Sequence, residues 1–118
     1  MRVLVVEDEA LVAMLIEDML EDMGHETAGT ASQLGDALEM AQRMVVDLAI
    51  IDLNLNGQRT DEVARILSER GVPFVFATGY GAGGLSPEWA GSPTVQKPFQ
   101  PHQLEDAIKK TLDRKSLT

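Results

Sequence analysis

The sequence of 118 residues contains no cysteine. Disulfide bonds, cysteine-ligated zinc, iron–sulfur clusters and thiolate nucleophiles are therefore excluded. The sequence also has no apolar run approaching the roughly 20 residues that a transmembrane helix needs. The N-terminus, MRVLVVEDE, carries one basic residue and a short apolar run, without the features of a signal peptide. We therefore expect a cytoplasmic protein that does not bind membranes.

Positive charge is also scarce, because 10 lysines and arginines face 19 aspartates and glutamates, and the formal net charge is −9. A phosphate backbone repels such a chain, so direct nucleic-acid binding is not expected. Divalent cations and basic protein surfaces are better partners for this charge. The length fits one domain, and no repeat, linker or low-complexity tract divides the sequence.

Short apolar runs alternate with stretches whose apolar residues recur at helical spacing. The runs predict strands and the amphipathic stretches predict helices. Ser32 and Thr60 directly precede two of the helical stretches and are expected to cap them. The alternation indicates a parallel sheet with helices on both faces. The expected strands are residues 2–6, 26–31, 48–51, 72–77 and 94–96, and the expected helices are residues 9–23, 33–44, 61–70 and 101–112.

The segment of residues 79–93, between the last two strands, contains five glycines and two prolines. Each glycine disfavours a helix by about 1 kcal/mol relative to alanine, and each proline by about 3 kcal/mol. We therefore expect the fourth helix to be shortened or disordered, with at most a turn at residues 86–90 that Ser86 caps. Trp89 lies in this segment, and it either folds back onto the domain or marks a surface for a partner.

Polar side chains occupy four of the expected strand ends, where ligands bind to open parallel sheets. Clustered carboxylates favour a hard divalent cation such as Mg²⁺. A carboxylate beside that cation can attack a phosphoryl group, while a cationic group and a hydroxyl stabilise the charge on its oxygens. Because like charges repel, Asp8→Asn is expected to raise the stability of the metal-free chain. The residues are Glu7 and Asp8 after the first strand, Asp52 after the third, Thr78 after the fourth and Lys97 after the fifth.

Four motifs carry a resemblance to a known family: VVEDE, IIDLN, FATG and VQKPF, in this order along the chain. Together they resemble the receiver domain of bacterial two-component response regulators. The resemblance implies a flavodoxin-like (CheY-like) α/β fold in three layers, with five parallel strands in the order 2-1-3-4-5. It also implies that residues 1–118 form a single receiver domain without an output domain.

The resemblance assigns the phosphoryl chemistry to three residues. Asp52 is in the position of the phosphoacceptor, and Thr78 is in the position of the switch hydroxyl. Lys97 is in the position of the lysine that pairs with the phosphoryl group. In the family the bond that corresponds to Lys97–Pro98 is cis, which an X–Pro bond permits at low cost.

The resemblance also implies a resident Mg²⁺ or Mn²⁺ ion. Asp8 and Asp52 are in the positions of the carboxylates that bind the metal directly. Asn54 is in the position whose backbone carbonyl joins them, and Glu7 is expected to act through a water molecule.

A narrower similarity joins PFVFATGYG (Pro73–Gly81) to the signature of stand-alone receivers called the FAT GUY group. The sequence also departs from the family pattern. Thr94 replaces the usual switch aromatic, Asn56 replaces a proline, and Thr60 replaces a glycine. Tyr80 follows Thr78 by two residues and is a candidate to gate water or to replace the missing aromatic.

The expected function is to accept a phosphoryl group on Asp52 from a histidine kinase or a histidine phosphotransfer protein. The output is expected to be contact with a downstream protein, by a monomer that is not an enzyme in its own right. Two alternatives keep the fold: a phosphate sink, and a module that binds its partner without phosphorylation. A third is a small aspartate-nucleophile phosphatase, which Asn54 and the short length disfavour.

Overall fold

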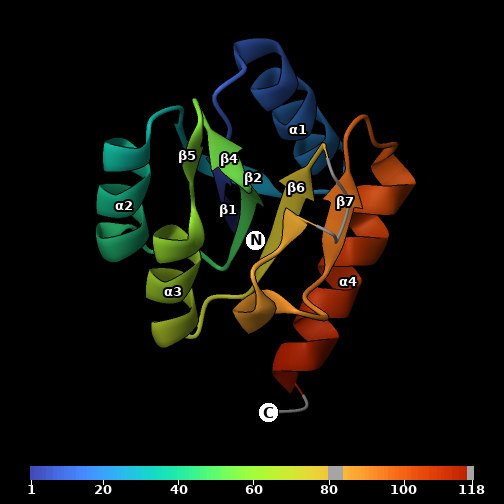
Figure 1. The fold of residues 1–118 in the computed structure, drawn as a ribbon. Helices are drawn as coiled ribbons and strands as arrows, with labels where there is room; N and C mark the ends of the chain where they lie inside the picture. The colour runs from blue at the N-terminus through green and yellow to red at the C-terminus, as the bar shows by residue number, and fades with distance from the viewer. Residues whose placement is uncertain (80–83, 117–118) are drawn as a thin grey trace.

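The computed structural model describes residues 1–79 and 84–116, and its centre is a parallel five-stranded sheet (Figure 1). The strand order is β2-β1-β3-β6-β7, which confirms the predicted order 2-1-3-4-5. A separate antiparallel pair, β4–β5, follows β3. The strands are β1 (Arg2–Val6), β2 (Glu26–Ala31), β3 (Leu48–Asp52), β4 (Asn54–Leu55), β5 (Gln58–Arg59), β6 (Phe74–Thr78) and β7 (Thr94–Gln96).

Helices cover both faces of the sheet, so the predicted three layers are present. The helices α1 (Ala10–Asp22) and α4 (Pro101–Ser116) pack against one face. The helices α2 (Leu34–Arg43) and α3 (Asp61–Glu69) pack against the other. None of the helices in the described ranges has the length and apolarity that crossing a membrane requires.

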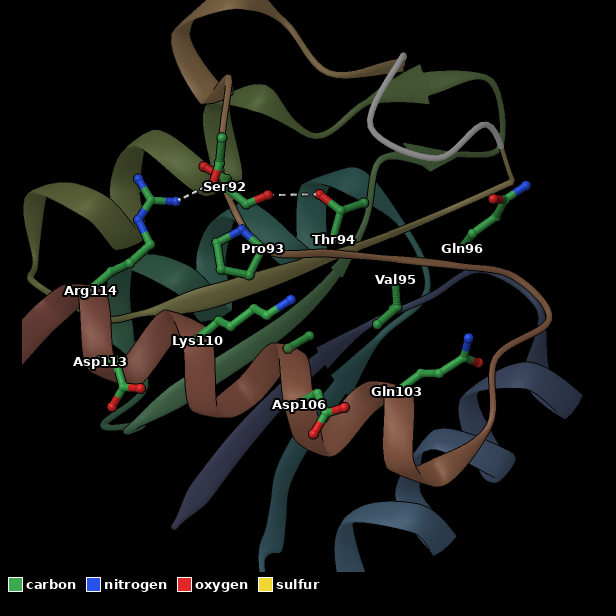
Figure 2. A pocket seen from close by; sticks show the side chains of 12 residues that line it. Ser92, Pro93, Thr94, Val95, Gln96, Gln103, Asp106, Lys110, Asp113 and Arg114 are labelled. Carbon is green, nitrogen blue, oxygen red and sulfur yellow. Dashed lines mark hydrogen bonds between the residues drawn. The ribbon is translucent and has the colours of Figure 1, made fainter.

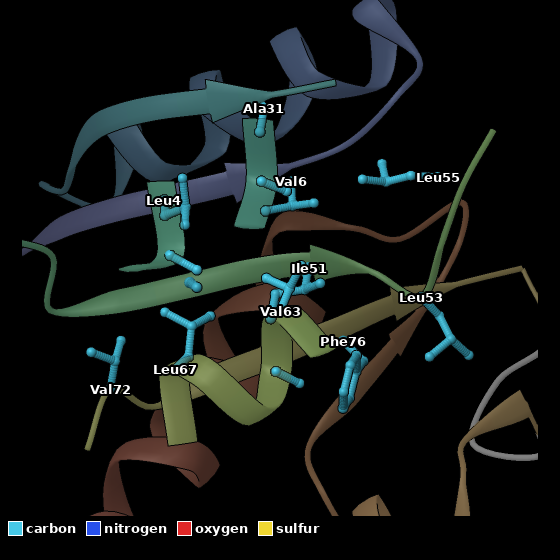
Figure 3. Close-up of a cluster of buried hydrophobic side chains, with 14 of the residues drawn as sticks. Leu4, Val6, Ala31, Ile51, Leu53, Leu55, Val63, Leu67, Val72 and Phe76 are labelled. Carbon is cyan, nitrogen blue, oxygen red and sulfur yellow. The ribbon is translucent and has the colours of Figure 1, made fainter. Parts of the chain in front are cut away.

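The central strands are apolar throughout because successive side chains enter different cores. In β1, Val3 and Val5 face the core beneath α1 and α4. Leu4 and Val6 face the core beneath α2 and α3, which Figure 3 shows in close-up. A polar residue in these runs would be buried on either face, which explains why the period-2 alternation of a half-exposed strand is missing.

The main departures from the predicted elements are a helix cap, a strand start and a helix end. The residue in the N-cap position of α2 is Gln33, so Ser32 does not cap this helix. The Ser32 backbone carbonyl instead accepts a hydrogen bond from the Asn56 side chain. The strand β6 begins at Phe74 and not at residue 72, because Pro73 has no N–H to give to a ladder. The last helix continues to Ser116, past the predicted end at residue 112.

The apolar stripe of α1 is wider than the face that it buries. Ile16 and Leu20 are buried, but the side chains of Leu11 and Leu15 are 70% and 51% exposed. Helical periodicity alone predicted that these leucines are buried like Ile16 and Leu20. The sequence therefore predicted the helix correctly and overestimated the width of its packed face.

The connection between β6 and β7 contains the 3₁₀ turn η2 (Pro87–Trp89) in its described part, in agreement with the predicted shortening of the fourth helix. Trp89 folds back onto the domain, and its ring centroid lies 5.5 Å from that of Phe74 and 6.0 Å from that of Phe76. This resolves the alternative left open by the sequence in favour of core packing. Tyr80 lies outside the described residues.

Candidate functional site

The register of the sheet brings the polar strand ends to one edge. Val6 pairs with Ile51, so the residue after β1, Glu7, lies beside the last residue of β3, Asp52. Asp52 in turn pairs with Ala77, and Thr78 pairs with Gln96. Lys97, which follows β7, donates its backbone N–H to the carbonyl of Thr78 over 2.9 Å. Residues that are up to 90 positions apart in the chain thus meet at the carboxyl edge.

Three carboxylates gather at this edge. Glu7, Asp8 and Asp52 each offer one oxygen, and these oxygens all lie within 4.8 Å of one another. Glu7 and Asp52 are buried, whereas Asp8 is partly exposed. Oxygen ligands in this number and at this spacing suit Mg²⁺, which keeps several water molecules and binds through a few carboxylates. The residues present therefore fit the cation that the sequence predicts.

Lys97 joins two of these carboxylates. Its Nζ atom donates to Glu7 Oε1 over 2.5 Å and to Asp52 Oδ2 over 2.9 Å. Burial by itself disfavours the ammonium, but these two partners outweigh it and raise the pKa of Lys97. The lysine is therefore held as a cation against the carboxylate that is the predicted phosphoacceptor.

The pKa of Glu7 is raised in the folded chain, whereas the pKa of Asp8 is lowered. Burial raises the pKa of Glu7 from 4.5 to about 7, and its hydrogen bond from Lys97 offsets this only in part. Burial also acts on Asp8, but hydrogen bonds, led by the one from the Asn56 backbone N–H, outweigh it and lower its pKa. These directions contradict the expectation that Asp8→Asn stabilises the metal-free chain. The substitution expected to stabilise it is instead one that neutralises Glu7.

This difference predicts a pH dependence that Glu7→Gln removes. A raised carboxyl pKa means that the fold favours the protonated form, so this stability is present below pH 4.5 and is lost as the pH rises to about 7. Lys97 stays charged throughout this range. With metal chelated, we expect the wild type to lose about 3 kcal/mol of unfolding free energy over this range through Glu7. Glu7→Gln should unfold at higher denaturant concentration than the wild type at pH 8 and should show a flatter profile.

Urea unfolding at a series of pH values measures this effect. Titratable groups remote from Glu7 contribute equally to the wild type and to Glu7→Gln, so their contributions cancel in the difference between the two unfolding free energies. Glu21→Gln removes the same charge from an exposed position of α1 and should keep the wild-type profile. A Glu7→Gln profile parallel to that of the wild type would show that Glu7 is not the strained carboxylate.

Two hydrogen bonds hold Asp52 from its own loop. The Asn54 backbone N–H donates to Asp52 Oδ1 over 3.1 Å, and the hydroxyl of Thr60 donates to the Asp52 backbone carbonyl over 2.7 Å. Thr60 is fully buried and stands in the N-cap position of α3, but its side chain does not cap that helix. The predicted capping role is thus wrong, because the hydroxyl fixes the end of β3 instead.

The hairpin β4–β5 was missed in the sequence, although Asn56-Gly57 is a strong hairpin signal. Asn56 and Gly57 have φ angles of 52° and 85°, the left-handed values that a two-residue hairpin turn needs. Proline, with φ fixed near −65°, cannot adopt this conformation and has no N–H to donate to Asp8. The departure of Asn56 from the family pattern therefore has a structural purpose, because its backbone N–H supports the carboxylate of Asp8.

The sequence profile of the response regulator receiver domain family matches residues 3–109. The chain belongs to this family. It is 32% identical over 117 residues to the transcriptional regulatory protein PdtaR of Mycobacterium tuberculosis, covering 96% of this chain and 57% of that protein. It is 33% identical to the phyllosphere-induced regulator PhyR of Methylorubrum extorquens, covering 94% and 43%. The chain thus spans about half the length of these curated relatives.

Solved receiver structures give the same result. SdrG from Sphingomonas melonis Fr1 superposes with a TM-score of 0.85 at 37% identity, covering 94% of this chain and 95% of that chain. The receiver domain of Erythrobacter litoralis PhyR superposes with a TM-score of 0.82 at 33% identity, covering 95% and 89%. The flavodoxin-like fold predicted for this receiver is therefore confirmed, and the Lys97–Pro98 bond is cis as the family resemblance implied.

A small cavity opens beside the candidate phosphoacceptor of this receiver. It has a volume of about 120 Å³, and its lining includes Asp52 and Thr78. Asn54 also lines it and is exposed to solvent. The residues predicted as acceptor and switch thus border a common cavity, as the order of the strand ends indicated.

Thr94, the residue in place of the receiver aromatic, lies in a different concavity. This one has a volume of about 650 Å³, is formed between β7 and α4, and is shown in Figure 2. The Thr94 hydroxyl donates to the carbonyl of Ser92 over 2.9 Å. None of the three clustered carboxylates lines this concavity. The role of Thr94 as a modulating residue remains a prediction, and its hydroxyl is engaged locally.

Proposed function

We propose that this receiver accepts a phosphoryl group on Asp52 from a histidine kinase or a histidine phosphotransfer protein. The observation that carries the proposal is the setting of the Asp52 side chain. Its carboxylate lies within the acid cluster, is paired with Lys97, and borders the small cavity that Thr78 also lines. This arrangement supplies a nucleophile, a cation and a hydroxyl around one space.

A Mg²⁺ ion held by Asp8, Asp52 and the Asn54 carbonyl, with Glu7 acting through water, would neutralise charge on the phosphoryl oxygens. The protein supplies the remaining parts. An oxygen of Asp52 attacks phosphorus, the oxygen–phosphorus bond forms, and the bond from phosphorus to the donor's imidazole nitrogen breaks. The nitrogen keeps that electron pair. Because the donor ring is protonated on its other nitrogen, the products are an acyl phosphate on Asp52 and a neutral imidazole.

Lys97 and Thr78 stabilise the charge that arrives with the phosphoryl group, which adds about −1.5 to −2 at neutral pH. The ammonium of Lys97 already contacts the acceptor carboxylate and needs only a short movement to reach a phosphoryl oxygen. Thr78, which is buried at the end of β6, provides a hydroxyl donor on the adjacent strand. The hydrogen bonds from Lys97 and Thr78 to the phosphoryl oxygens strengthen as negative charge develops on those oxygens, which favours phosphoryl transfer.

The biological role follows from this chemistry. Receiver domains interact with kinases or other protein partners, and we propose that this chain signals in the cytoplasm as a stand-alone receiver and a monomer. The PFVFATGYG motif, which resembles the signature of stand-alone receivers, supports this role. It is not an enzyme for an external substrate in this proposal, because the group that it receives stays on Asp52 until water removes it.

The wild-type chain tests the proposal directly. Incubation with acetyl phosphate and Mg²⁺ should add the mass of one phosphoryl group, and hydroxylamine should remove it, as it removes acyl phosphates. Chelation of the metal by EDTA should prevent the adduct. A folded chain that gains no phosphoryl group with Mg²⁺ present would exclude the proposed function.

A further inference from the structure

Arg59, the last residue of the β4–β5 hairpin, links the loop after the acceptor to the segment before β7. Its Nε and Nη2 atoms donate to the two carboxylate oxygens of Asp61 over 3.0 and 3.3 Å. Nη2 also donates to the Gly84 carbonyl over 3.2 Å and to Ser86 Oγ over 3.1 Å. The Ser86 hydroxyl donates to Asp61 over 3.1 Å and does not cap η2, so the predicted capping role of Ser86 is wrong.

Arg59 also lines the cavity beside Asp52. Of the described residues that line this cavity, Arg59 is the only one with a positive charge, because Lys97 contacts Asp52 without lining it. A volume of about 120 Å³ is several times what one water molecule needs, so the cavity has room for a phosphoryl group. A phosphoryl group on Asp52 that enters this cavity therefore meets Arg59.

We propose that Arg59 is a second cationic ligand of the phosphoryl group and connects it to the Gly84–Ser86 segment. The proposal rests on the proposed function of Asp52. The Nη1 atom of Arg59 donates to no acceptor among the described residues, so the guanidinium retains donor capacity for a phosphoryl oxygen. Arginine suits this task because its planar, permanently charged fork binds several oxygens at once.

Bridging predicts the direction of the conformational effect. When Asp52 is occupied, Nη1 binds the phosphoryl group while Nη2 still binds the Gly84 carbonyl and Ser86 hydroxyl. The phosphoryl charge then holds the guanidinium in place, and the guanidinium holds the segment. Occupancy therefore shifts residues 84–90 toward their ordered form, which is a common response of loops to a new phosphate.

Arg65 provides a matched control because it ties the same segment without reaching the cavity. From α3 it binds Glu88 through Nε and Nη2, the closest distance being 2.8 Å, and it binds Glu62 through Nη1 over 2.9 Å. Arg65 does not line the cavity beside Asp52. Loss of Arg65 removes an anchor of the segment and leaves the phosphoryl pocket intact.

The experiment uses beryllofluoride, a stable mimic of the aspartyl phosphoryl group, with Mg²⁺ saturating. Binding is measured by fluorine NMR for the wild type, Arg59→Gln, Arg59→Lys and Arg65→Gln. Because charge-assisted hydrogen bonds are among the strong ones, Arg59→Gln should weaken binding by roughly tenfold or more. Arg59→Lys, which keeps the charge but not the fork, should fall between, and Arg65→Gln should match the wild type.

Hydrogen exchange separates a ligand role from a merely structural one. In the wild type and in Arg65→Gln, beryllofluoride should slow amide exchange in residues 84–90. In Arg59→Gln, occupancy at saturating beryllofluoride should leave that exchange unchanged. Wild-type affinity in Arg59→Gln, or full protection of the segment on its occupancy, would overturn the role of Arg59 while leaving Asp52 as the acceptor. A wild type that binds no beryllofluoride would instead defeat the proposed function itself.

Discussion

Asp52→Asn is expected to abolish the phosphoryl adduct completely. The side chain keeps its size and an oxygen for the Asn54 backbone N–H, but an amide is a poor nucleophile and cannot form a stable acyl phosphate. With acetyl phosphate and Mg²⁺, intact-mass measurement should show one phosphoryl group on the wild type and none on the variant. No other single substitution is expected to have so large an effect on phosphorylation.

A matched control comes from the other end of the same strand. Asp47 precedes β3, is exposed, and accepts a hydrogen bond from the Arg2 backbone N–H. Asp47→Asn should therefore leave the adduct and its lability to hydroxylamine unchanged. If Asp52→Asn were modified to the wild-type extent, or if Asp47→Asn lost the adduct, the assignment of the acceptor would be wrong.

Asp8→Asn is expected to remove the stabilisation that Mg²⁺ gives to the folded chain. Asp8 is the most accessible carboxylate of the cluster, and its low pKa keeps it ionised and ready to bind a cation. At a Mg²⁺ concentration of ten times the dissociation constant, binding raises the unfolding free energy by about 1.4 kcal/mol. The wild type should show this increase in thermal or urea unfolding, and Asp8→Asn should show close to none.

The comparison needs a variant that loses the same charge elsewhere, because Mg²⁺ also screens surface acids. Asp18 is exposed on α1, and Asp18→Asn should keep the full response to Mg²⁺. An Asp8→Asn chain that Mg²⁺ stabilises as strongly as the wild type would place the metal site away from the cluster.

The fold and the main site residues were predictable because they depend on patterns that can be recognised in the sequence alone. Alternating strand and helix periods determine a parallel sheet, and the carboxyl ends of its strands share one edge. The sequence therefore predicted that Glu7, Asp52 and Thr78 lie together. The glycine-rich segment also predicted correctly that the described part of the connection between β6 and β7 contains no regular α-helix.

What the sequence did not reveal depends on which of several partners a polar side chain selects. Ser32, Thr60 and Ser86 all looked like helix caps, because short hydroxyl residues before a helix often are. The hydroxyls of Thr60 and Ser86 bind the Asp52 carbonyl and the Asp61 carboxylate instead. The competing acceptors come from distant parts of the chain, and only the folded arrangement brings them within reach.

The uneven cost within the acid cluster is a second example. Glu7 and Asp8 are adjacent in sequence and have the same charge, and like-charge repulsion predicted strain that Asp8→Asn would relieve. Burial separates them, since Glu7 is 1% exposed and Asp8 is turned toward the hairpin that donates an N–H to it. The resulting pKa shifts have opposite directions. Sequence specifies the charges, but the depth of each carboxylate depends on tertiary packing.

The most direct test of the central claim is to locate the phosphoryl group on the wild-type chain. After reaction with acetyl phosphate and Mg²⁺, borohydride reduces an aspartyl phosphate to homoserine, which marks the residue permanently. Peptide mass spectrometry should then find homoserine at position 52 and at no other aspartate. Homoserine at another aspartate, with residue 52 unmodified, would contradict the assignment of Asp52 as the acceptor.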